Sequence, residues 1–399
     1  MMNKEKRRVP KLRFPEFTED WEQRKLESIL IEYTEKNPGN ENLPVLTSSR
    51  QGLTKQEDHF GSVQRHDISD YNVIPLGFCT YRNRSDDKTF TFNINRIVPR
   101  GLVSKFYPVF EIKNGNADFI TEYLNNNTEI IKSLAINAVG TSQVVLSLRT
   151  LRNIGITLPL KEEQVAIGDL MRKLDIYITL HQRKLDNLKL KKKALLQKLF
   201  PKNGERYPEL RFPRFTDAWE QRKADYIFKS VTDKGYPELP VLSASQELGM
   251  VYRDQNGIDI QHDKKNETSY KRVLPGQFVI HLRSFQGGFA YSEIEGITSP
   301  AYTVISFKHS SEQYGLFWKH VFKSETFIKR LETITYGIRD GRSISFSDFK
   351  SLLLQYPSFS EQKLIGDLIA VIERGITLHQ RKLDHLQLQK KALLQQMFV

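Results

Sequence analysis

Two pairs of polar loop segments carry the side chains with the clearest chemistry. The first half of the chain contains "TYRNRSDDK" (Thr80–Lys88) and "VGTSQVV" (Val139–Val145), and the second half contains "HLRSFQGG" (His281–Gly288) and "GIRDGRSIS" (Gly337–Ser345). Arg, Asn, Gln and Ser side chains hydrogen-bond to base edges and phosphate groups, and Phe285 could stack or wedge between bases. Ordinary solvated loops have the same composition, which is the alternative for each segment.

One short pattern has the composition of a metal-dependent nuclease site. "EIK" (Glu111–Lys113), with Asp86 or Asp87 upstream, could form a D…ExK triad that holds Mg²⁺. The matching segment of the second half, "SFK" (Ser306–Lys308), lacks the carboxylate. A plain strand with exposed charges is therefore the favoured interpretation. The sequence contains no Walker A loop, dinucleotide fingerprint, HExxH or paired cysteine motif.

The charge balance favours a polyanionic partner. The chain has 60 Lys and Arg against 47 Asp and Glu, giving a net charge of +13, so nucleic acid is favoured over a membrane surface. A basic protein without such a partner is the alternative. The single cysteine, Cys79, excludes an internal disulfide and is interpreted as a small buried hydrophobe. With no apolar signal region and no membrane-length apolar run, we expect a cytoplasmic protein without membrane contact.

The chain is a tandem duplication. "KLRFPEFTEDWEQRKL" (Lys11–Leu26) and "ELRFPRFTDAWEQRKA" (Glu209–Ala224) agree at 11 of 16 positions, and Glu162–Phe200 agrees with Ser360–Phe398 at 24 of 39. Both matches have an offset of 198, whereas the central stretches align only faintly. Similar ends indicate a shared task, such as docking to one another or to two copies of one partner. Divergent centres indicate two different ligands, or two versions of one ligand.

The repeated stretches after Pro159 and Pro357 have the apolar spacing of long coiled-coil helices. Two such helices in one chain are easiest to connect as an antiparallel pair with pseudo-twofold symmetry. Ser360 is an expected N-cap of the second helix. The seam follows gaps of four and three residues through Ile167, Met171, Leu174, Ile178, His181, Leu185, Leu188, Lys192, Leu195 and Leu199, and through Ile365, Ile369, Ile372, Ile376, His379, Leu383, Leu386, Lys390, Leu393 and Met397.

Histidine and lysine interrupt both seams at equivalent positions. His181 and His379 could form a metal or proton site, but polar seam residues more commonly fix the register of a coiled coil at a cost in stability. We therefore favour register control for the histidines and for Lys192 and Lys390.

The modules before the helices have short β-type runs separated by turn signals, such as "NVIPLGFCTYR" and "YPVFEIK", and then a helical stretch. That stretch is expected at Asp118–Leu134, with a counterpart near Glu312–Glu332. The predicted fold class is α+β, with two modules in tandem repeat separated by the helix pair. The expected segments are 1–160, 161–200, 201–357 and 358–399.

The whole layout resembles the specificity subunit of a type I restriction–modification enzyme. The resemblance rests on "LRFPEFTEDWEQRKL" and "LRFPRFTDAWEQRK" at the module starts, and on "LPLKEEQVAIGDL" and "YPSFSEQKLIGDL" at the helix starts. "TLHQRKLDNLKLKKKALLQKLF" and its copy at the helix ends add to it. The order and duplication of these motifs are more specific than any one of them.

The resemblance implies a non-catalytic subunit with two target-recognition domains and two spacer helices. Each domain would read one half of a bipartite, asymmetric double-stranded DNA target, and the helices would set the spacer. Two methyltransferase subunits and two translocase/endonuclease subunits would be partners, with S-adenosylmethionine, ATP and Mg²⁺ on those partners and no cofactor on this chain. By the family pattern, the loops after Gly140 and Gly337 face the DNA.

The candidate DNA-binding residues follow from that pattern. Asp340 could instead be a structural partner of a neighbouring arginine. The first choices are Thr141, Ser142, Gln143, Arg339, Asp340 and Arg342, and the second choices are Arg82, Asn83, Arg84, His281, Arg283 and Gln286. Two other classes remain open from the residues alone, namely a nuclease that acts by itself and a scaffold that bridges two identical proteins without binding DNA.

Overall fold

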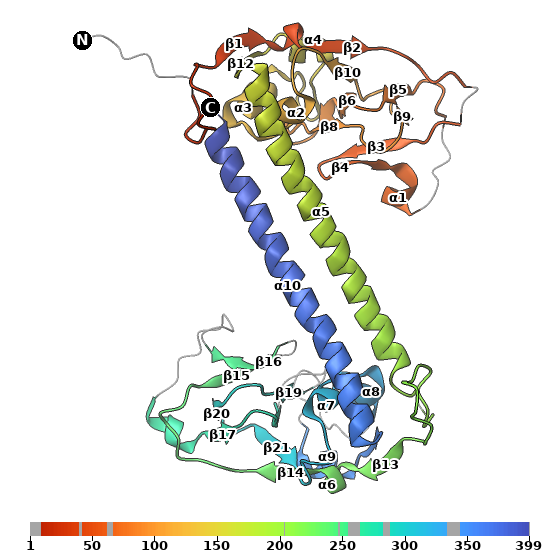
Figure 1. Ribbon diagram of the computed structural model, residues 1–399, viewed down its shortest axis with the longest axis vertical. Helices are drawn as coiled ribbons and strands as arrows, with labels where there is room; N and C mark the ends of the chain where they lie inside the picture. The colour runs from red at the N-terminus through yellow and green to blue at the C-terminus, as the bar shows by residue number, and fades with distance from the viewer. Residues whose placement is uncertain are drawn as a thin grey trace. The chain divides into compact units, whose positions relative to one another are not determined.

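The computed structural model of the chain forms two compact units. It describes residues 9–39, 42–61, 67–202, 204–245, 248–253, 264–281, 288–332 and 344–398. The first unit comprises Met1–Arg183 and Gln380–Val399, and the second comprises Lys184–His379 (Figure 1). Each unit therefore contains one globular module together with part of each long helix.

The first module is built from short antiparallel strands. Its four-stranded sheet has the order β2 (Leu30–Tyr33), β10 (Val109–Ile112), β6 (Cys79–Tyr81) and β8 (Phe92–Ile94). Two-stranded ladders pair β1 (Glu22–Lys25) with β12 (Gly155–Leu158), β3 (Leu46–Ser49) with β4 (Gly52–Lys55), β5 (Asn72–Pro75) with β9 (Arg100–Val103), and β7 (Arg84–Ser85) with β11 (Val144–Val145). Two short helices, α1 (Gln56–Phe60) and α4 (Leu148–Arg152), and one 3₁₀ turn, η1 (Leu26–Ser28), join them.

The helical stretch expected at Asp118–Leu134 is divided into two helices. These are α2 (Ala117–Asn126) and α3 (Thr128–Asn137). Asn127 between them is extended, and its side chain accepts a hydrogen bond of 3.0 Å from the backbone amide of Ile130. An asparagine side chain competes with the backbone for helical hydrogen bonds and is favoured as an N-cap, which accounts for the break.

The second module repeats this order of elements. Its sheet follows β14 (Phe228–Val231), β21 (Thr303–Phe307), β18 (Phe278–Ile280) and β19 (Phe289–Tyr291). The ladders pair β13 (Glu220–Lys223) with β22 (Leu353–Tyr356), β15 (Leu242–Ser245) with β16 (Gly249–Tyr252), and β17 (Lys271–Val273) with β20 (Gly296–Thr298). The helical segments are α6 (Ala224–Ile227), η3 (Lys264–Ser269), α7 (Gly315–Val321), α8 (Glu325–Glu332) and α9 (Phe346–Ser351).

Two long helices follow the modules, as the seam predicted. They are α5 (Lys161–Lys198) and α10 (Phe359–Met397). In the second unit, Lys192 pairs with Glu373, and Leu188 lies opposite Gly375, so the two helices run antiparallel there. The predicted α+β class with a pair of long antiparallel helices is confirmed. The expectation for Ser360 was wrong because α10 already begins at Phe359, which places Ser360 inside the first turn.

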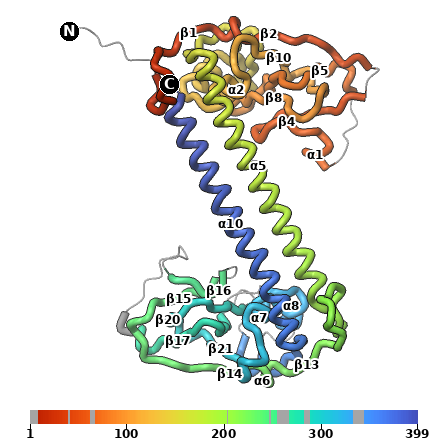
Figure 2. Tube along the Cα trace, viewed as in Figure 1, coloured from red at the N-terminus to blue at the C-terminus, as the bar shows by residue number. Residues whose placement is uncertain are grey.

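The identical ends of the repeats hold the helices onto the modules. Phe398, which follows α10, packs against Phe119 of the first core with ring centroids 5.7 Å apart. Phe200, which follows α5, packs against Phe317 of the second core at 5.6 Å. The backbone amide of Leu12 also donates a hydrogen bond of 2.9 Å to the carbonyl of Gln396, so the last turn of α10 lies beside the N-terminal segment (Figure 2).

Buried polar contacts fix each helix start in the same way. Arg13 donates from Nε and Nη2 to the two carboxylate oxygens of Glu163, both at 2.7 Å, and Arg211 does so to Glu361 at 2.8 Å. The carboxylate hydrogen bond raises the pKa of Arg13, as it does for Arg211. These residues belong to the repeated "LRFP" and "EQ" motifs. The motifs therefore serve to dock module and helix onto one another within each unit.

Across the described ranges, no helix is both long enough and apolar enough to pass through a bilayer.

Candidate nucleic-acid interface

The first unit brings its two candidate loops together. Strand β7 pairs with β11, so that Ser85 lies opposite Val144 and Arg84 opposite Val145. The side-chain amide of Gln143 donates a hydrogen bond of 3.0 Å to the carboxylate of Asp86. Thr141, Ser142, Gln143, Arg82 and Arg84 are all exposed. Side chains that lie 57 to 61 positions apart in the sequence therefore share one solvent-facing surface.

A tight turn at Gly140 shapes the second loop. The backbone amides and carbonyls of Val139 and Val145 are hydrogen-bonded to each other at 3.0 and 2.8 Å, which closes the loop. Gly140 has φ +138°, and a Cβ placed there would lie 2.3 Å from the carbonyl oxygen of Gln143. Only glycine fits this position without moving the backbone. The turn holds Thr141, Ser142 and Gln143 at the tip of the loop.

A polar cleft of about 250 Å³ lies beside these loops. It is lined by Ser48, Ser49, Arg50, Arg82, Arg84, Ser85, Asp86, Asp87, Thr89 and Thr91. The guanidinium carbon of Arg84 lies 4.0 Å from the ring centroid of Phe106, a cation–π contact that orients the arginine. Three arginines and several hydroxyl groups thus surround a space open to solvent. Such a donor-rich surface suits phosphate oxygens and base edges.

Asp87 keeps this cleft from being purely basic. Hydrogen bonds from the hydroxyl of Ser85, the guanidinium of Arg50 and the backbone amide of Thr89 hold the pKa of Asp87 well below its usual range. Its carboxylate is therefore charged at neutral pH and forms an ion pair with Arg50. The pair orders the β3–β4 turn, which carries Arg50, next to the candidate loops.

Asn83 differs from its exposed neighbours because it is half-buried. Its backbone amide donates to Phe106 at 3.2 Å, and its carbonyl accepts from Leu146 at 2.9 Å. Its side-chain oxygen Oδ1 is buried and has no donor among the described residues. Asn83 thus supports the loop through its backbone, whereas Arg82 and Arg84 point to the surface on either side of it.

Residues 83–190, which include Arg84 and the 141–143 loop, match the family model described as type I restriction modification DNA specificity domain. The chain carries a type I DNA specificity domain. The S subunit of a type I restriction–modification system from M. genitalium covers 98% of this chain and 99% of its own at 12% identity, with a TM-score of 0.61. That likeness shows a shared fold over the whole chain. The HsdS subunit from Thermoanaerobacter tengcongensis covers 94% of each chain at 15% identity, with a TM-score of 0.42.

The family match confirms the resemblance that the sequence motifs predicted. It spans the second loop of the specificity domain, α2, α3 and most of α5. Its beginning at Asn83 leaves out the first strands of the module and Arg82. The second unit is related to this specificity domain through the internal repeat and the matching order of strands.

In the second unit, His281 is the candidate residue that the structure describes. It follows β18, is half-buried, and donates its backbone amide to Gly288 at 2.9 Å. Burial lowers the pKa of His281, so its ring is neutral at pH 7. Its ring centroid lies 6.2 Å from that of Tyr302. The remaining candidates, Arg283, Gln286, Arg339, Asp340 and Arg342, together with Phe285, lie outside the described residues.

The seam residues of the long helices are all buried or half-buried. Those below one tenth exposure are Ile167, Met171, Leu185, Leu199, Ile365, Ile369, Ile372, Leu383, Leu386 and Met397. Those that are half-buried are Leu174, Ile178, His181, Leu188, Lys192, Leu195, Ile376, His379, Lys390 and Leu393. The positions predicted to form the seam thus face protein rather than solvent.

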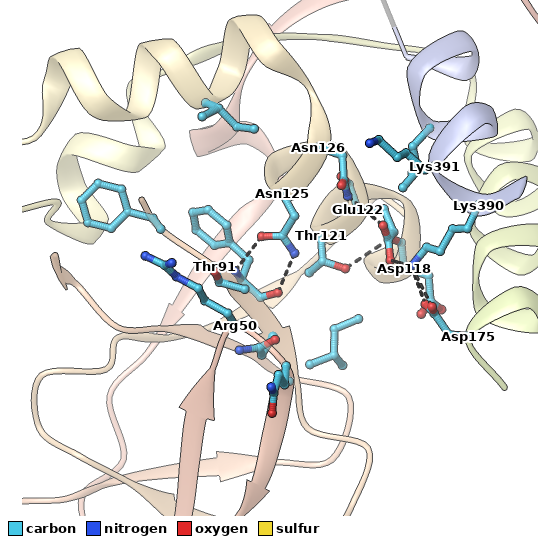
Figure 3. Close-up of a pocket in the computed structure, with 18 of the residues that line it drawn as sticks. Arg50, Thr91, Asp118, Thr121, Glu122, Asn125, Asn126, Asp175, Lys390 and Lys391 are labelled. Carbon is cyan, nitrogen blue, oxygen red and sulfur yellow. Dashed lines mark hydrogen bonds and ion pairs between the residues drawn. The ribbon is translucent and has the colours of Figure 1, made fainter. Parts of the chain in front are cut away.

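The two seam lysines form equivalent ion pairs. Lys390 donates to Asp175 and to Glu122, both at 2.7 Å, and Lys192 lies 2.7 Å from Glu373, the residue equivalent to Asp175 (Figure 3 for Lys390). Burial alone would lower the pKa of Lys390, but the two carboxylates raise it. Each lysine therefore joins one long helix to the other at one register, as expected for a polar seam position.

No group of three or more His, Cys, Asp or Glu residues that could hold a metal ion occurs in the part of the chain that the structure describes. Two alternatives from the sequence analysis would need a bound metal ion, namely the D…ExK nuclease triad with Glu111 and a metal site at His181. Glu111 lies on β10 with its side chain exposed, opposite Ile31 of β2. Asp87 is engaged by Arg50 and Ser85, as described above.

Arg50 is the functional candidate that the sequence analysis missed. It lies in the turn "SSRQG" between β3 and β4, shortly after "LPVL" (Leu43–Leu46), which recurs at Leu239–Leu242. Its proximity to Arg82 and Arg84 depends on the packing of that hairpin beside β7, which is separated from it by more than thirty residues. The signal that could have identified Arg50 from the sequence was the presence of an arginine at the tip of a hairpin.

Proposed function

We propose that this chain is the sequence-reading, non-catalytic subunit of a type I restriction–modification complex. Each unit reads one half-site of a bipartite, asymmetric double-stranded DNA target. The observation that carries the proposal is the β7–β11 pairing, which assembles Arg82, Arg84 and Gln143 around one open polar cleft. This surface lies in the domain that matches the specificity family.

The side chains at the cleft suit direct readout in the major groove. An arginine can donate two hydrogen bonds to guanine, and a glutamine can pair with the donor and acceptor of adenine. Each good bidentate contact discriminates by about 1–3 kcal/mol. The surplus of 13 positive charges supplies salt-sensitive phosphate binding that does not depend on sequence. Gln143 and the two arginines would therefore choose the bases, while the wider surface supplies affinity.

The helix pair would set the spacing and dock the partners. Helices of 38 and 39 residues with a rise of about 1.5 Å per residue are each roughly 57 Å long. Leu180 and Leu190 on α5, and their repeat equivalents Leu378 and Leu388 on α10, are 59%, 64%, 66% and 66% exposed. Apolar side chains exposed at equivalent positions support docking of two copies of one partner, which we propose are methyltransferase subunits.

Catalysis would belong to those partners. S-adenosylmethionine, ATP and Mg²⁺ would bind to methyltransferase and translocase subunits, while this chain selects the DNA. The sequence has no Walker A loop, dinucleotide fingerprint, HExxH or paired cysteine motif, and Asp87 of the D…ExK pattern is engaged by Arg50, which supports that division.

The test uses the full chain co-purified with its methyltransferase subunit. Arg82→Ala and Gln143→Ala should change the preferred bases of one half-site and leave the other half-site unchanged. Lys132→Ala is the matched control, because it removes a cation that is 63% exposed on α3 of the same unit, away from the cleft. The proposal fails if the loop variants alter both half-sites equally, or if they behave like Lys132→Ala.

A further inference from the structure

A second, larger groove in the first unit is continuous with the polar cleft beside the candidate loops. Its volume is about 980 Å³, and it shares Arg50, Thr89 and Thr91 with the cleft. From there it extends along α2 to the helix pair, where Arg172 of α5 and Lys391 of α10 line it. Figure 3 shows Arg50 and Thr91 on one side of this space and the two lysines of α10 on the other.

The first-unit groove is lined by cations, and its carboxylates are already engaged. Arg96 pairs with Asp118, and Lys390 pairs with Glu122 and Asp175. Arg96 balances Asp118, whereas Lys390 is shared by two carboxylates, so these pairs leave one negative charge on the acidic wall. Lys88, Arg172 and Lys391 line the same groove without taking part in those pairs. The groove therefore presents a net positive surface between the recognition loops and the long helices.

The second unit has a groove at the equivalent place. It has a volume of about 680 Å³ and lies between the end of α5 and helices α7 and α8. Lys193 of α5 is the repeat equivalent of Lys391, and both line their grooves. The lysines around the second groove are Lys192, Lys193, Lys198, Lys202, Lys323 and Lys329, against the carboxylates of Glu209 and Glu325. Although the modules have diverged, the basic character of the groove is present in both.

The second groove also contains a buried polar group without a described partner. His320, the repeat equivalent of Glu122, is 3% exposed and lines the groove. Its Nε2 atom is buried and has no hydrogen-bond partner among the described residues. In the first unit, Glu122 accepts a hydrogen bond from Lys390. In the second unit, the equivalent lysine, Lys192, pairs with Glu373. A buried ring nitrogen that has no partner among the described residues, and that lies beside several lysines, suits an oxygen-rich anionic ligand.

We propose that both grooves bind the phosphodiester backbone of the DNA between the two half-sites. The inference rests on the proposed function and extends it to a part of the target that carries no sequence information. Lysine is suited to this role, since its ammonium group binds phosphate as a point charge and does not read bases. In the first unit, continuity of the groove with the polar cleft favours DNA over a free phosphate compound.

The structure offers matched variants for the test. Lys193 and Lys391 line the grooves, whereas Lys184 and Lys382 are exposed on the same helices nine residues earlier. Nine residues at about 100° per residue amount to about two and a half turns, so the two pairs lie on opposite helix faces. The double variant Lys193→Ala/Lys391→Ala is compared with Lys184→Ala/Lys382→Ala, each co-purified with the methyltransferase subunit.

The measurement is the dissociation constant for a target duplex and for an unrelated duplex over a range of NaCl concentrations. Loss of two phosphate contacts should reduce the slope of log K against log salt by about 1.8, at roughly 0.9 per contact. The groove variant should weaken binding to both duplexes by a similar factor and leave the selected motif unchanged. The opposite-face variant should retain the wild-type slope.

Neutral methylphosphonates in the spacer give a second readout. Such substitutions should weaken DNA binding by the wild type but have little further effect on DNA binding by the groove variant. The inference is overturned if the groove variant keeps the wild-type slope, or if only the target duplex loses affinity. Failure of the wild type to select a bipartite motif would instead reject the proposed function, while the salt slope on unrelated DNA would still test the grooves.

Discussion

The side-chain amide of Gln143 donates a hydrogen bond of 3.0 Å to Asp86, joining two loops that are separated by 57 positions in the sequence. Asp86, which accepts this bond, lines the polar cleft and directly follows β7 of the β7–β11 pairing. It orients the amide of Gln143 while leaving the residue exposed. An oriented amide at the tip of a rigid loop costs less conformational entropy on binding than a mobile one.

The turn at Gly140 should be essential for reading one half-site. Gly140→Ala adds a Cβ 2.3 Å from the carbonyl oxygen of Gln143 at a φ of +138°, so the loop must shift. Strain of roughly 1–3 kcal/mol would lower affinity for that half-site by about 5- to 150-fold. Gly61→Ala is the control, because Gly61 also has a positive φ but open space around it. Equal affinities for the two variants would show that the loop geometry is unimportant.

The buried arginine–glutamate pairs should each stabilise one unit. In Arg13→Met, the carboxylate of Glu163, which is 0% exposed, loses both of its charged hydrogen bonds. Removal of one partner of a buried pair costs about 3–5 kcal/mol. Arg211→Met should have an effect of similar size through Glu361. Urea denaturation of the full chain is followed by the fluorescence of Trp21 or Trp219 in single-tryptophan backgrounds, so that each loss of stability is assigned to its own unit. A loss below about 1 kcal/mol would contradict the role of the pair as a buried, stabilising contact.

The two seam lysines should differ in their contribution to stability. Lys390→Met leaves Glu122 and Asp175 without their shared cation, whereas after Lys192→Met the carboxylate of Glu373 still has Lys319 at 3.5 Å. We expect a loss of roughly 2–3 kcal/mol in the free energy of unfolding for Lys390→Met and a smaller loss for Lys192→Met. Chemical denaturation measures both, and a larger effect at Lys192 would be inconsistent with the described contacts.

His320 should make the second unit sensitive to mild acid. Burial lowers the pKa of His320 to about 4, below its ordinary value of 6.5. Between these pH values the unfolded chain binds the proton more tightly than the folded chain does. The free energy of unfolding is therefore unaffected by His320 above about pH 6.5 and decreases as the pH falls toward 4. The loss approaches roughly 3 kcal/mol at 1.36 kcal/mol per pKa unit.

The check on this pH dependence is a comparison of His320→Gln with the wild type by urea denaturation from pH 7.5 to 4.5. The variant should lose less stability than the wild type over this interval. His59→Gln, which replaces an exposed histidine of the first unit, serves as the control. Parallel pH profiles for His320→Gln and the wild type would show that His320 does not titrate in this range.

The long helices could be predicted closely because their spacing is local and persistent. A period of four and three residues continues from Ile167 to Leu199, and α5 extends from Lys161 to Lys198. The ion pair between Lys390 and Asp175 could not be predicted from that period alone, since it depends on which helix segments meet. The break at Asn127 was also missed, because an asparagine within an apolar periodic stretch is a weak signal until its capping bond is seen.

The recognition surface was predicted as separate loops but not as one cleft. Residue types marked Arg82, Arg84 and Gln143 as hydrogen-bonding candidates. Strands β7 and β11, which bring them together, are only two residues long and have no periodic pattern of their own. The position of Arg50 depends on the packing of a distant hairpin, which sequence spacing does not encode.

The central claim is tested most directly by selection from a randomised pool of DNA duplexes, with the full chain bound to its methyltransferase subunit at moderate salt. If each unit reads one half-site, as proposed, the selection should enrich a two-part asymmetric motif with a fixed gap. Gly140→Ala should then weaken the enrichment of one part only. Enrichment of a single continuous motif, or only salt-sensitive retention of all duplexes, would contradict the assignment of one half-site to each unit.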